Sequence, residues 1–227
     1  MKTNRIKHSL LMGLIAVSTI ITARAQSDTN LLLNANGQTG NMTDWTAVLS
    51  GGNGWYVANG YSGISVLPGS SYAFLTSYGM DVRSQTIDLV ADGFSTTQLD
   101  GAPTISISDW VLANANSDAK SYYFVNVQLE DASHNVIASW SDGTQGSPLT
   151  LYASAGWTEV TDSLQNYGSG LRYIVFEDGG QDSMYWAGNY GAAFDASSVI
   201  VQAVPEPSTL ALAGLGGLGL LLFRRRK

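Results

Sequence analysis

Cysteine is absent from this chain of 227 residues, which excludes disulfide bonds, thiolate metal sites and a thiol nucleophile. Histidine is nearly absent too, since only His134 lies between the two ends, and a histidine-rich metal centre is excluded. Basic residues are also few: Arg83, Lys120 and Arg172 stand against 17 acidic residues in the central region 26–203. So acidic a surface repels nucleic acid phosphates and anionic lipid, and we expect no nucleic acid partner.

The rest of the composition indicates a folded domain. Hydrophobic residues make up 44% of the chain and aromatic residues 10%, too large a share for a solvated, disordered coil. Residues 26–203 are numerous enough for one domain with a sizeable core.

The N-terminus has the features of an export signal. Lys2, Arg5 and Lys7 precede an apolar run over residues 10–21, and small residues flank Arg24. This pattern is typical of a secretory signal peptide, which we expect to span residues 1–25 and to be removed by signal peptidase. An uncleaved membrane anchor is the alternative, and either segment places the central domain outside the inner membrane.

The C-terminus combines three features. Pro205, Glu206 and Pro207 interrupt regular structure, an uncharged and mostly apolar run follows over 209–223, and four basic residues end the chain at 224–227. As a helix the apolar run would span about 22 Å, short for a bilayer core of about 30 Å. We expect a weak transmembrane helix whose basic end stays cytoplasmic, holding the protein to the membrane before processing.

The same three features over residues 204–227 resemble the PEP-CTERM sorting signal of exported bacterial proteins. The resemblance implies recognition by an exosortase, cleavage near the Pro-Glu-Pro motif, and delivery to the cell surface or the extracellular matrix. An ordinary tail anchor is the alternative.

The central region alternates between apolar and polar residues rather than repeating at helical spacing. In Ser121–Glu130, for example, Tyr123, Val125, Val127 and Leu129 fall on one face. The predicted strands are 31–34, 55–59, 72–77, 82–89, 104–112, 121–130, 136–140, 149–152, 158–164, 171–177 and 198–201. Gly-rich turn signals separate many of them, and residues 91–99 could hold a helical turn. The pattern predicts an all-β fold, an antiparallel β-sandwich of jelly-roll type with about ten strands.

A series of short segments covers most of this region. They read LLLN at 31–34, a segment around Trp45, GGNGW at 51–55, TSY at 76–78, SQTIDL at 84–89, ISDW at 107–110, residues 122–129, WTEV at 157–160, GLRYIVF at 170–176, GGQDSMYWAGNYG at 179–191 and SSV at 197–199. In this order and spacing the set resembles the F-box-associated (FBA) domain, the sugar-recognising module of certain F-box proteins. The resemblance implies a jelly-roll β-sandwich, in agreement with the periodicity.

In sugar-binding members of that family, a Tyr-Trp pair near the C-terminal end contacts the chitobiose core of high-mannose N-glycans. The matching pair here is Tyr185 and Trp186. Those members carry a lysine after the tryptophan, whereas this chain has Ala187. A second aromatic contact would lie within 60–69, where Tyr61 is the one aromatic residue. We expect no F-box, because the signal peptide ends almost where the domain begins, so the ubiquitin-ligase role of the family is not implied.

The residues themselves point to the same loop. Glycines precede and follow Tyr185 and Trp186, and neighbours in an extended segment point in opposite directions, so both rings are not expected to be buried. An exposed aromatic face can stack on a sugar ring, while Asp182, Ser183 and Asn189 could bind hydroxyl groups. Alternatively, Trp186 closes the end of the sandwich and Tyr185 packs on an edge. The other tryptophans are predicted to pack in or beside the core.

Three other kinds of site could be built from the residues of this chain. Glu130, Glu159 and Glu177 could suggest a glycosidase, but that chemistry needs two carboxylates about 5–9.5 Å apart, and solvated strand faces are the simpler explanation. A Ser-His-Asp triad would have to use His134, which lies in a turn-like segment. Structural calcium is possible in a fold of this kind, although no EF-hand loop is present. We therefore expect no catalytic residues, no cofactor and no metal ligands.

These observations predict an exported, surface-sorted and non-catalytic carbohydrate-binding module. It would recognise a neutral oligosaccharide or exopolysaccharide by aromatic stacking, with Tyr185, Trp186, Asp182 and Asn189 as the ligand-binding residues. A structural extracellular-matrix protein, whose sandwich is only a spacer or protein-contact module, is the alternative, and a glycosidase is the third.

Overall fold

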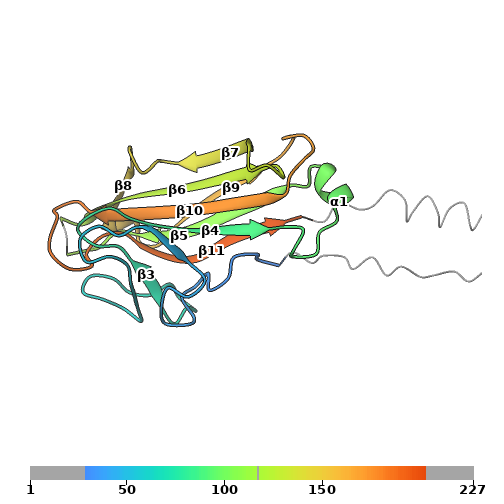
Figure 1. Ribbon diagram of the computed structural model, residues 1–227. Coiled ribbons are helices and arrows are strands. Elements are labelled where there is room, and N and C mark those ends of the chain that lie inside the picture. The colour runs from blue at the N-terminus through green and yellow to red at the C-terminus, as the bar shows by residue number, and fades with distance from the viewer. Residues whose placement is uncertain (1–28, 117, 203–227) are drawn as a thin grey trace, which may run out of the picture.

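The computed structural model describes residues 29–116 and 118–202, which form two antiparallel sheets packed face to face (Figure 1). One sheet contains, in spatial order, β1 (Thr46–Leu49), β4 (Asp81–Asp88), β10 (Tyr173–Asp182), β6 (Lys120–Glu130) and β7 (Val136–Asp142), with β8 (Leu149–Tyr152) paired to β6. The other contains β2 (Tyr56–Ala58), β3 (Ala73–Leu75), β11 (Ala193–Val201), β5 (Ile105–Leu112) and β9 (Thr158–Leu164). The predicted all-β sandwich is confirmed.

Two short helical segments accompany the sheets: α1 (Thr96–Asp100) and the 3-10 turn η1 (Ala153–Ala155). Helix α1 begins where the sequence allowed a helical turn. Its N-cap Ser95 accepts a hydrogen bond from the Gln98 N–H, and the Gln98 side chain accepts one from the Ser95 N–H. This capping box explains why so short a helix forms there.

The predicted strand at 31–34 is wrong. Asn30 Oδ1 accepts the Leu32 N–H, and the Gln85 side chain binds both the N–H and the carbonyl of Leu33. Asn34 then turns the chain at φ +47°. Side chains thus take the backbone hydrogen bonds that a sheet ladder would need, and the segment runs as a turn.

Strand β1 was not predicted. Its four residues are all exposed and show no apolar alternation, because β1 lies at the edge of its sheet and pairs only with β4 among the described strands. A strand that buries neither face carries no periodic signal.

The core lies between the sheets, and β6 illustrates its pattern. Tyr123, Val125, Val127 and Leu129 are all buried, as predicted from the alternation. Trp45 lies among them and packs edge-to-face on Phe74 and Phe176, with ring centroids 5.9 and 6.0 Å away.

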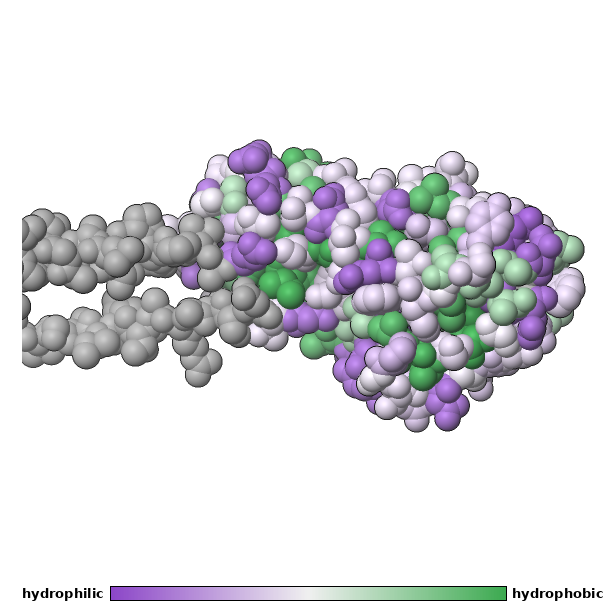
Figure 2. Space-filling model, turned by 180° about the vertical axis from the view of Figure 1, so that it is seen from behind, coloured by the Kyte–Doolittle hydropathy of each residue, from purple (hydrophilic) through white to green (hydrophobic). Residues whose placement is uncertain are grey.

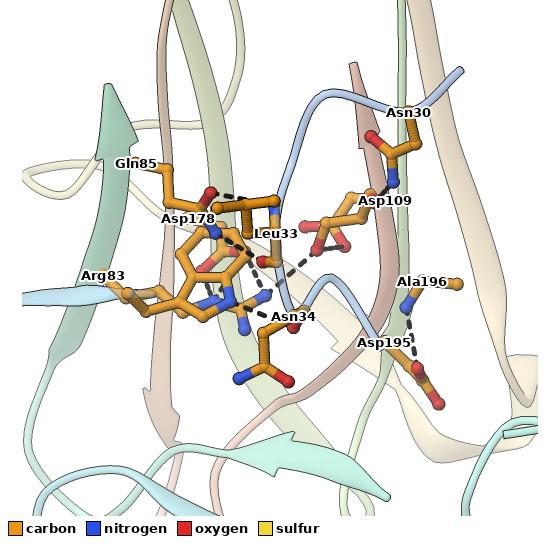
Figure 3. A network of polar contacts seen from close by, with 11 residues as sticks. Asn30, Leu33, Asn34, Arg83, Gln85, Asp109, Asp178, Asp195 and Ala196 are labelled. Carbon is orange, nitrogen blue, oxygen red and sulfur yellow. Dashed lines mark hydrogen bonds and ion pairs between the residues drawn. The ribbon is translucent and has the colours of Figure 1, made fainter. Parts of the chain in front are cut away.

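A buried polar network joins the two sheets within this core (Figure 3). Arg83 of β4 is fully buried and binds the carboxylate of Asp178 on β10 through Nε (2.8 Å) and Nη2 (2.7 Å). The aromatic rings of Trp45 and Phe74 lie 3.8 and 3.9 Å from the guanidinium carbon. Because an Arg-carboxylate pair of this geometry leaves little charge uncompensated, the cation is tolerated in the interior.

The second sheet contributes Asp109 and Ser197 to the network. Ser197 Oγ accepts a hydrogen bond from Arg83 Nη2 (3.0 Å) and donates one to Asp109 Oδ1 (2.9 Å). Burial and the nearby charge of Asp178 raise the pKa of Asp109 well above its ordinary value, although Arg83 opposes the shift. Asp109 and Ser197 thus connect the second sheet to the Arg83–Asp178 pair of the first.

The described chain begins and ends at the same end of the sandwich. Near its start Leu31 donates its N–H to Val199, and at its last described residue Gln202 donates to Thr104 (2.9 Å each). The β10–β11 loop lies at the opposite end (Figure 1). Within 29–116 and 118–202, no helix is both long and apolar enough to span a bilayer. The predicted signal peptide, the Pro205-Glu206-Pro207 motif and the predicted C-terminal helix lie outside the described residues.

Candidate functional site

The β10–β11 loop, residues 183–192, presents a group of large side chains to solvent. Met184 is 47% exposed, Tyr185 63% and Trp186 48%. The prediction that the Tyr-Trp pair lies on the surface is therefore confirmed, and Trp186 does not plug the sandwich as the alternative required. Contact between this pair and a sugar stays a prediction.

Asp182, the last residue of β10, shapes the start of this loop. One carboxylate oxygen accepts the Met184 N–H (3.0 Å) and the other accepts the Trp186 N–H (2.7 Å), while Tyr185 between them has φ +57°. A carboxylate that binds backbone amides two and four residues ahead forms a tight turn without help from a sheet.

This placement corrects the role predicted for Asp182. Its side chain is fully buried and both oxygens are occupied by the loop backbone, so it is not available to a sugar hydroxyl in this structure. It acts as a positioning residue for Trp186. The sequence placed Asp182 in the correct loop but could not reveal its burial.

The far side of the loop rests on the segment between β1 and β2. The Gly188 N–H donates to Asn53 Oδ1 (3.0 Å), and Asn189 Nδ2 donates to the Gly54 carbonyl (2.7 Å). Asn189 is half-buried and uses its amide group to hold the loop, so its contact with a sugar also stays a prediction. Asn53 was not predicted as a site residue, because its partner is distant in the sequence.

A buried carboxylate holds the supporting segment in turn. Asp81 of β4 accepts the Gly51 N–H (2.9 Å) on one oxygen and the Ser77 N–H (2.6 Å) on the other. Burial raises the pKa of Asp81 to about 6, although its hydrogen bonds from Ser77 and Gly51 work in the opposite direction. The Tyr-Trp loop is thus fastened to a second loop that is itself anchored in the first sheet.

Trp186 also begins a continuous series of rings, which we call the aromatic run: Trp186, Tyr190, Tyr61 and Tyr56. Successive ring centroids are 6.1, 5.4 and 5.8 Å apart, and the pairs meet at interplanar angles of 57–83°. The run crosses from the β10–β11 loop to β2. Of its members beyond Trp186, the sequence singled out only Tyr61, through the family resemblance. Tyr190 and Tyr56 were missed, and the spacing of Tyr190 four residues after Trp186 was the one available signal.

The glutamates considered for catalysis are not brought together. Glu159 lies on β9 in one sheet, and Glu130 and Glu177 lie in the other. Glu177 pairs with Asn126, four positions along β6 from Glu130, or about 13 Å along the strand. Glu130 and Glu177 therefore do not face each other across β6 and β10, and Glu159 lies in the other sheet. His134 Nδ1 lies 2.8 Å from Glu130 Oε2, and its ring stacks on Tyr173, so the histidine of the β6–β7 turn packs against the end of β6 and the start of β10.

Metal ligands do not gather in the described part of the chain either. Across residues 29–116 and 118–202, no three histidine, aspartate or glutamate side chains form a group that could hold a metal ion. The predicted absence of a cofactor stays a prediction.

Known protein families match two parts of the chain, the central domain and the C-terminal segment. The sequence profile of the F-box associated region matches residues 22–201, and that of the PEP-CTERM protein-sorting motif matches residues 203–227. Human F-box only protein 6 is 38% identical over 179 residues, covering 76% of this chain and 59% of its own length. Bovine F-box only protein 2 is 35% identical over 178 residues, with coverages of 76% and 59%. The chain thus spans about 60% of the length of these relatives.

Solved structures of the same general architecture are more distant. A TmCBM61 structure in complex with β-1,4-galactotriose has a TM-score of 0.48 and 13% identity, covering 76% of this chain and 99% of its own. The tandem CBM22 domains of Paenibacillus barcinonensis Xyn10C have a TM-score of 0.48 and 16% identity, covering 80% of this chain and 48% of their own.

Proposed function

Because the chain belongs to the family of the F-box associated region, we propose that it is a carbohydrate-binding module without catalytic activity, exported and sorted to the cell surface. Its ligand-binding residues are Tyr185 and Trp186. Signal peptidase and an exosortase are its processing partners.

The observation that carries the proposal is the fixed, exposed position of this pair. The backbone N–H of Trp186 donates a hydrogen bond to Asp182. The loop beyond Trp186 is held by hydrogen bonds to Asn53 and Gly54. An aromatic face held open by the fold can stack on the apolar face of a sugar without first losing conformational freedom. A buried or mobile tryptophan would lack this advantage.

The position of the loop also suits a protein displayed on a surface. The described chain ends at Gln202, at one end of the sandwich, and the Tyr-Trp loop lies at the other (Figure 1). A module attached through residues beyond Gln202 would turn Tyr185 and Trp186 away from the attachment point. The binding end would then face the surrounding polymer.

The charges favour a neutral glycan. All three basic residues within the described chain are held in ion pairs: Arg83 with Asp178, Lys120 with Asp118 and Arg172 with Asp100. The two that reach the surface are thus partly neutralised, and the many acidic residues would repel a carboxylate or sulfate. The ligand class is therefore a neutral oligosaccharide or exopolysaccharide, and the family resemblance suggests N-acetylglucosamine units. One shallow site of this kind should bind with a Kd near millimolar to tens of micromolar, or about 4–6 kcal/mol.

The alternative is a structural matrix protein in which the sandwich serves as a spacer or a protein contact. On the face shown in Figure 2, hydrophobic residues lie in separate groups among hydrophilic ones rather than in one continuous patch. This face offers little for a large protein interface, which is usually built around an apolar centre. It does not favour the alternative.

A glycan array tests the proposal. The full chain, exported through its own signal peptide and purified in mild detergent, is applied beside Trp186→Ala, with and without calcium. Selective binding that the variant loses supports a carbohydrate-binding module, and the calcium arms show whether the metal contributes. Absence of binding by the folded wild-type protein would reject the proposal in favour of the structural alternative.

A further inference from the structure

We infer that the binding site extends along the whole aromatic run, from Trp186 to Tyr56, and that its ligand is the interior of a linear chain of sugars rather than a single terminal sugar. This inference rests on the proposed function and specifies its substrate. The run is continuous, since each ring contacts the next at a centroid distance of 5.4–6.1 Å.

The exposure of the rings suggests two separate stacking positions. Trp186 and Tyr56, at the two ends, are 48% and 47% exposed. Tyr190 and Tyr61 between them are half-buried and meet their neighbours at steep angles. One sugar ring can stack on only one aromatic face at a time. Filling both ends therefore takes several linked sugars lying across the two inner tyrosines.

The backbone beneath the run holds the rings in place. Tyr61 and Ile64 exchange two backbone hydrogen bonds, 2.7 and 3.1 Å long, which close the turn that carries Tyr61. At Gly188 a Cβ atom would lie 2.6 Å from Tyr190 Cε2 and 3.3 Å from the Tyr61 hydroxyl. Only glycine lets the loop pass this close to both rings. The surface is thus preformed across two segments that are far apart in the sequence, as binding of an extended chain requires.

The test measures affinity against ligand length. The exported full-length protein is titrated with oligosaccharides of N-acetylglucosamine, of glucose and of mannose, from the monosaccharide to the hexasaccharide. We expect affinity for at least one series to rise about tenfold or more between the monosaccharide and the longer oligomers, because each added contact contributes free energy. A single stacking position would show no such rise beyond the first sugars.

Variants at the remote end of the run decide between the two outcomes. Tyr56→Ala should weaken binding of the longer oligomers about threefold to tenfold, because one aromatic contact is lost. The affinity for the shortest oligomer that binds at Trp186 should not change. Tyr56→Thr serves as a second variant that keeps the preference of β2 for a strand. Tyr152→Ala is the matched control, since Tyr152 is 60% exposed on β8 and lies outside the run.

The two proposals fail in different ways. Affinity that is independent of length, lost in Trp186→Ala but kept in both Tyr56 variants, overturns the extended site and leaves the carbohydrate-binding module. Absence of binding to every oligomer by the folded protein overturns both. A steep length dependence that both Tyr56 variants reduce and Tyr152→Ala does not supports the extended site.

Discussion

Asn53 and Gly188 lie 135 residues apart in the sequence and are joined by a hydrogen bond of 3.0 Å, in which the Gly188 N–H donates to Asn53 Oδ1. The bond fastens the loop that carries Trp186 to the loop between β1 and β2. It is one of two such links, the other running from Asn189 to Gly54. The geometry of the candidate site therefore depends on residues that need not touch a ligand.

Asn53→Ala should weaken glycan binding several-fold while lowering the free energy of unfolding by only about 1 kcal/mol, the net worth of one hydrogen bond. Asn135→Ala is a control of similar size, because Asn135 binds Asp131 in the β6–β7 turn, away from the aromatic run. Titration with the best glycan and urea unfolding of both variants give the comparison. Equal binding by the two variants would contradict a positioning role for Asn53.

Replacing Trp186 and Trp45 should separate binding from stability. Trp186→Ala is expected to abolish glycan retention with a change in unfolding free energy within about 1 kcal/mol, since the side chain is half exposed. Trp45→Ala removes a buried ring that packs on Phe74, Phe176 and Arg83, and should cost about 3–5 kcal/mol. A core-sized loss of stability in Trp186→Ala would instead favour the structural alternative.

Two substitutions of Asp182 should lower stability and glycan binding to different extents. Asp182→Asn keeps one acceptor oxygen and can hold one of the two amides of Met184 and Trp186, whereas Asp182→Ala holds neither. We expect the alanine variant to lose about 1–3 kcal/mol of stability and most of its glycan binding, and the asparagine variant to lie between it and the wild type. Similar binding by all three proteins would show that the turn does not need this carboxylate.

Stability should increase on mild acidification. Burial raises the pKa of Asp81 and that of Asp195 to about 6, so the folded state binds a proton at each carboxyl group before the unfolded state does. As the pH falls from 7.5 to 5, each group should therefore add about 1 kcal/mol to the free energy of unfolding. Asp100 and Asp131 have lowered pKa values, and their opposing effect begins only at more acidic pH.

Thermal unfolding at a series of pH values measures this effect. Asp195→Asn removes one of the two titrating groups and should flatten the rise in melting temperature between pH 7.5 and 5. A wild-type melting temperature that falls steadily over this range would contradict the prediction.

Breaking the buried Arg83–Asp178 ion pair should lower the free energy of unfolding about as much as removing Trp45. Asp178→Asn leaves the guanidinium of Arg83 without its counter-charge in the core and should cost about 3–5 kcal/mol. Glu177→Gln, at the neighbouring position on β10, changes a half-buried carboxylate and should cost about 1 kcal/mol or less. Urea unfolding of the two variants distinguishes a pair-specific loss from a general effect of removing charge on this strand.

The strands were predictable to the extent that each buries one face. Strands β4, β5 and β6 were predicted within one residue of their bounds, because the alternation of buried and less buried side chains is visible directly in neighbouring residues. The prediction failed where the sequence shows no such alternation or where a turn takes the place of a strand. Strand β1 buries neither face, and at 31–34 Leu32 is buried from within a turn whose hydrogen bonds come largely from side chains.

The candidate site shows the same difference between local features, which the sequence reveals, and long-range packing, which it does not. The exposure of Tyr185 and Trp186 followed from glycines and adjacent aromatics within one loop, which are local features. The burial of Asp182 could not be inferred, because a carboxylate beside a loop reads as solvated until the packing around it is known. Tyr56 carried no signal at all, since it reaches the aromatic run only through Tyr61.

The sequence by itself determined the class of fold, the family, the sorting motif and the loop that carries the Tyr-Trp pair. Each of these can be inferred from periodicity, from motifs or from the order of segments along the chain. Only the tertiary structure decided that Arg83 and Asp178 meet in the core, that Asn53 holds Gly188, and that aromatic residues from two distant segments form one surface. Such contacts arise from the pairing of strands and the packing of two sheets, and no short stretch of sequence specifies them.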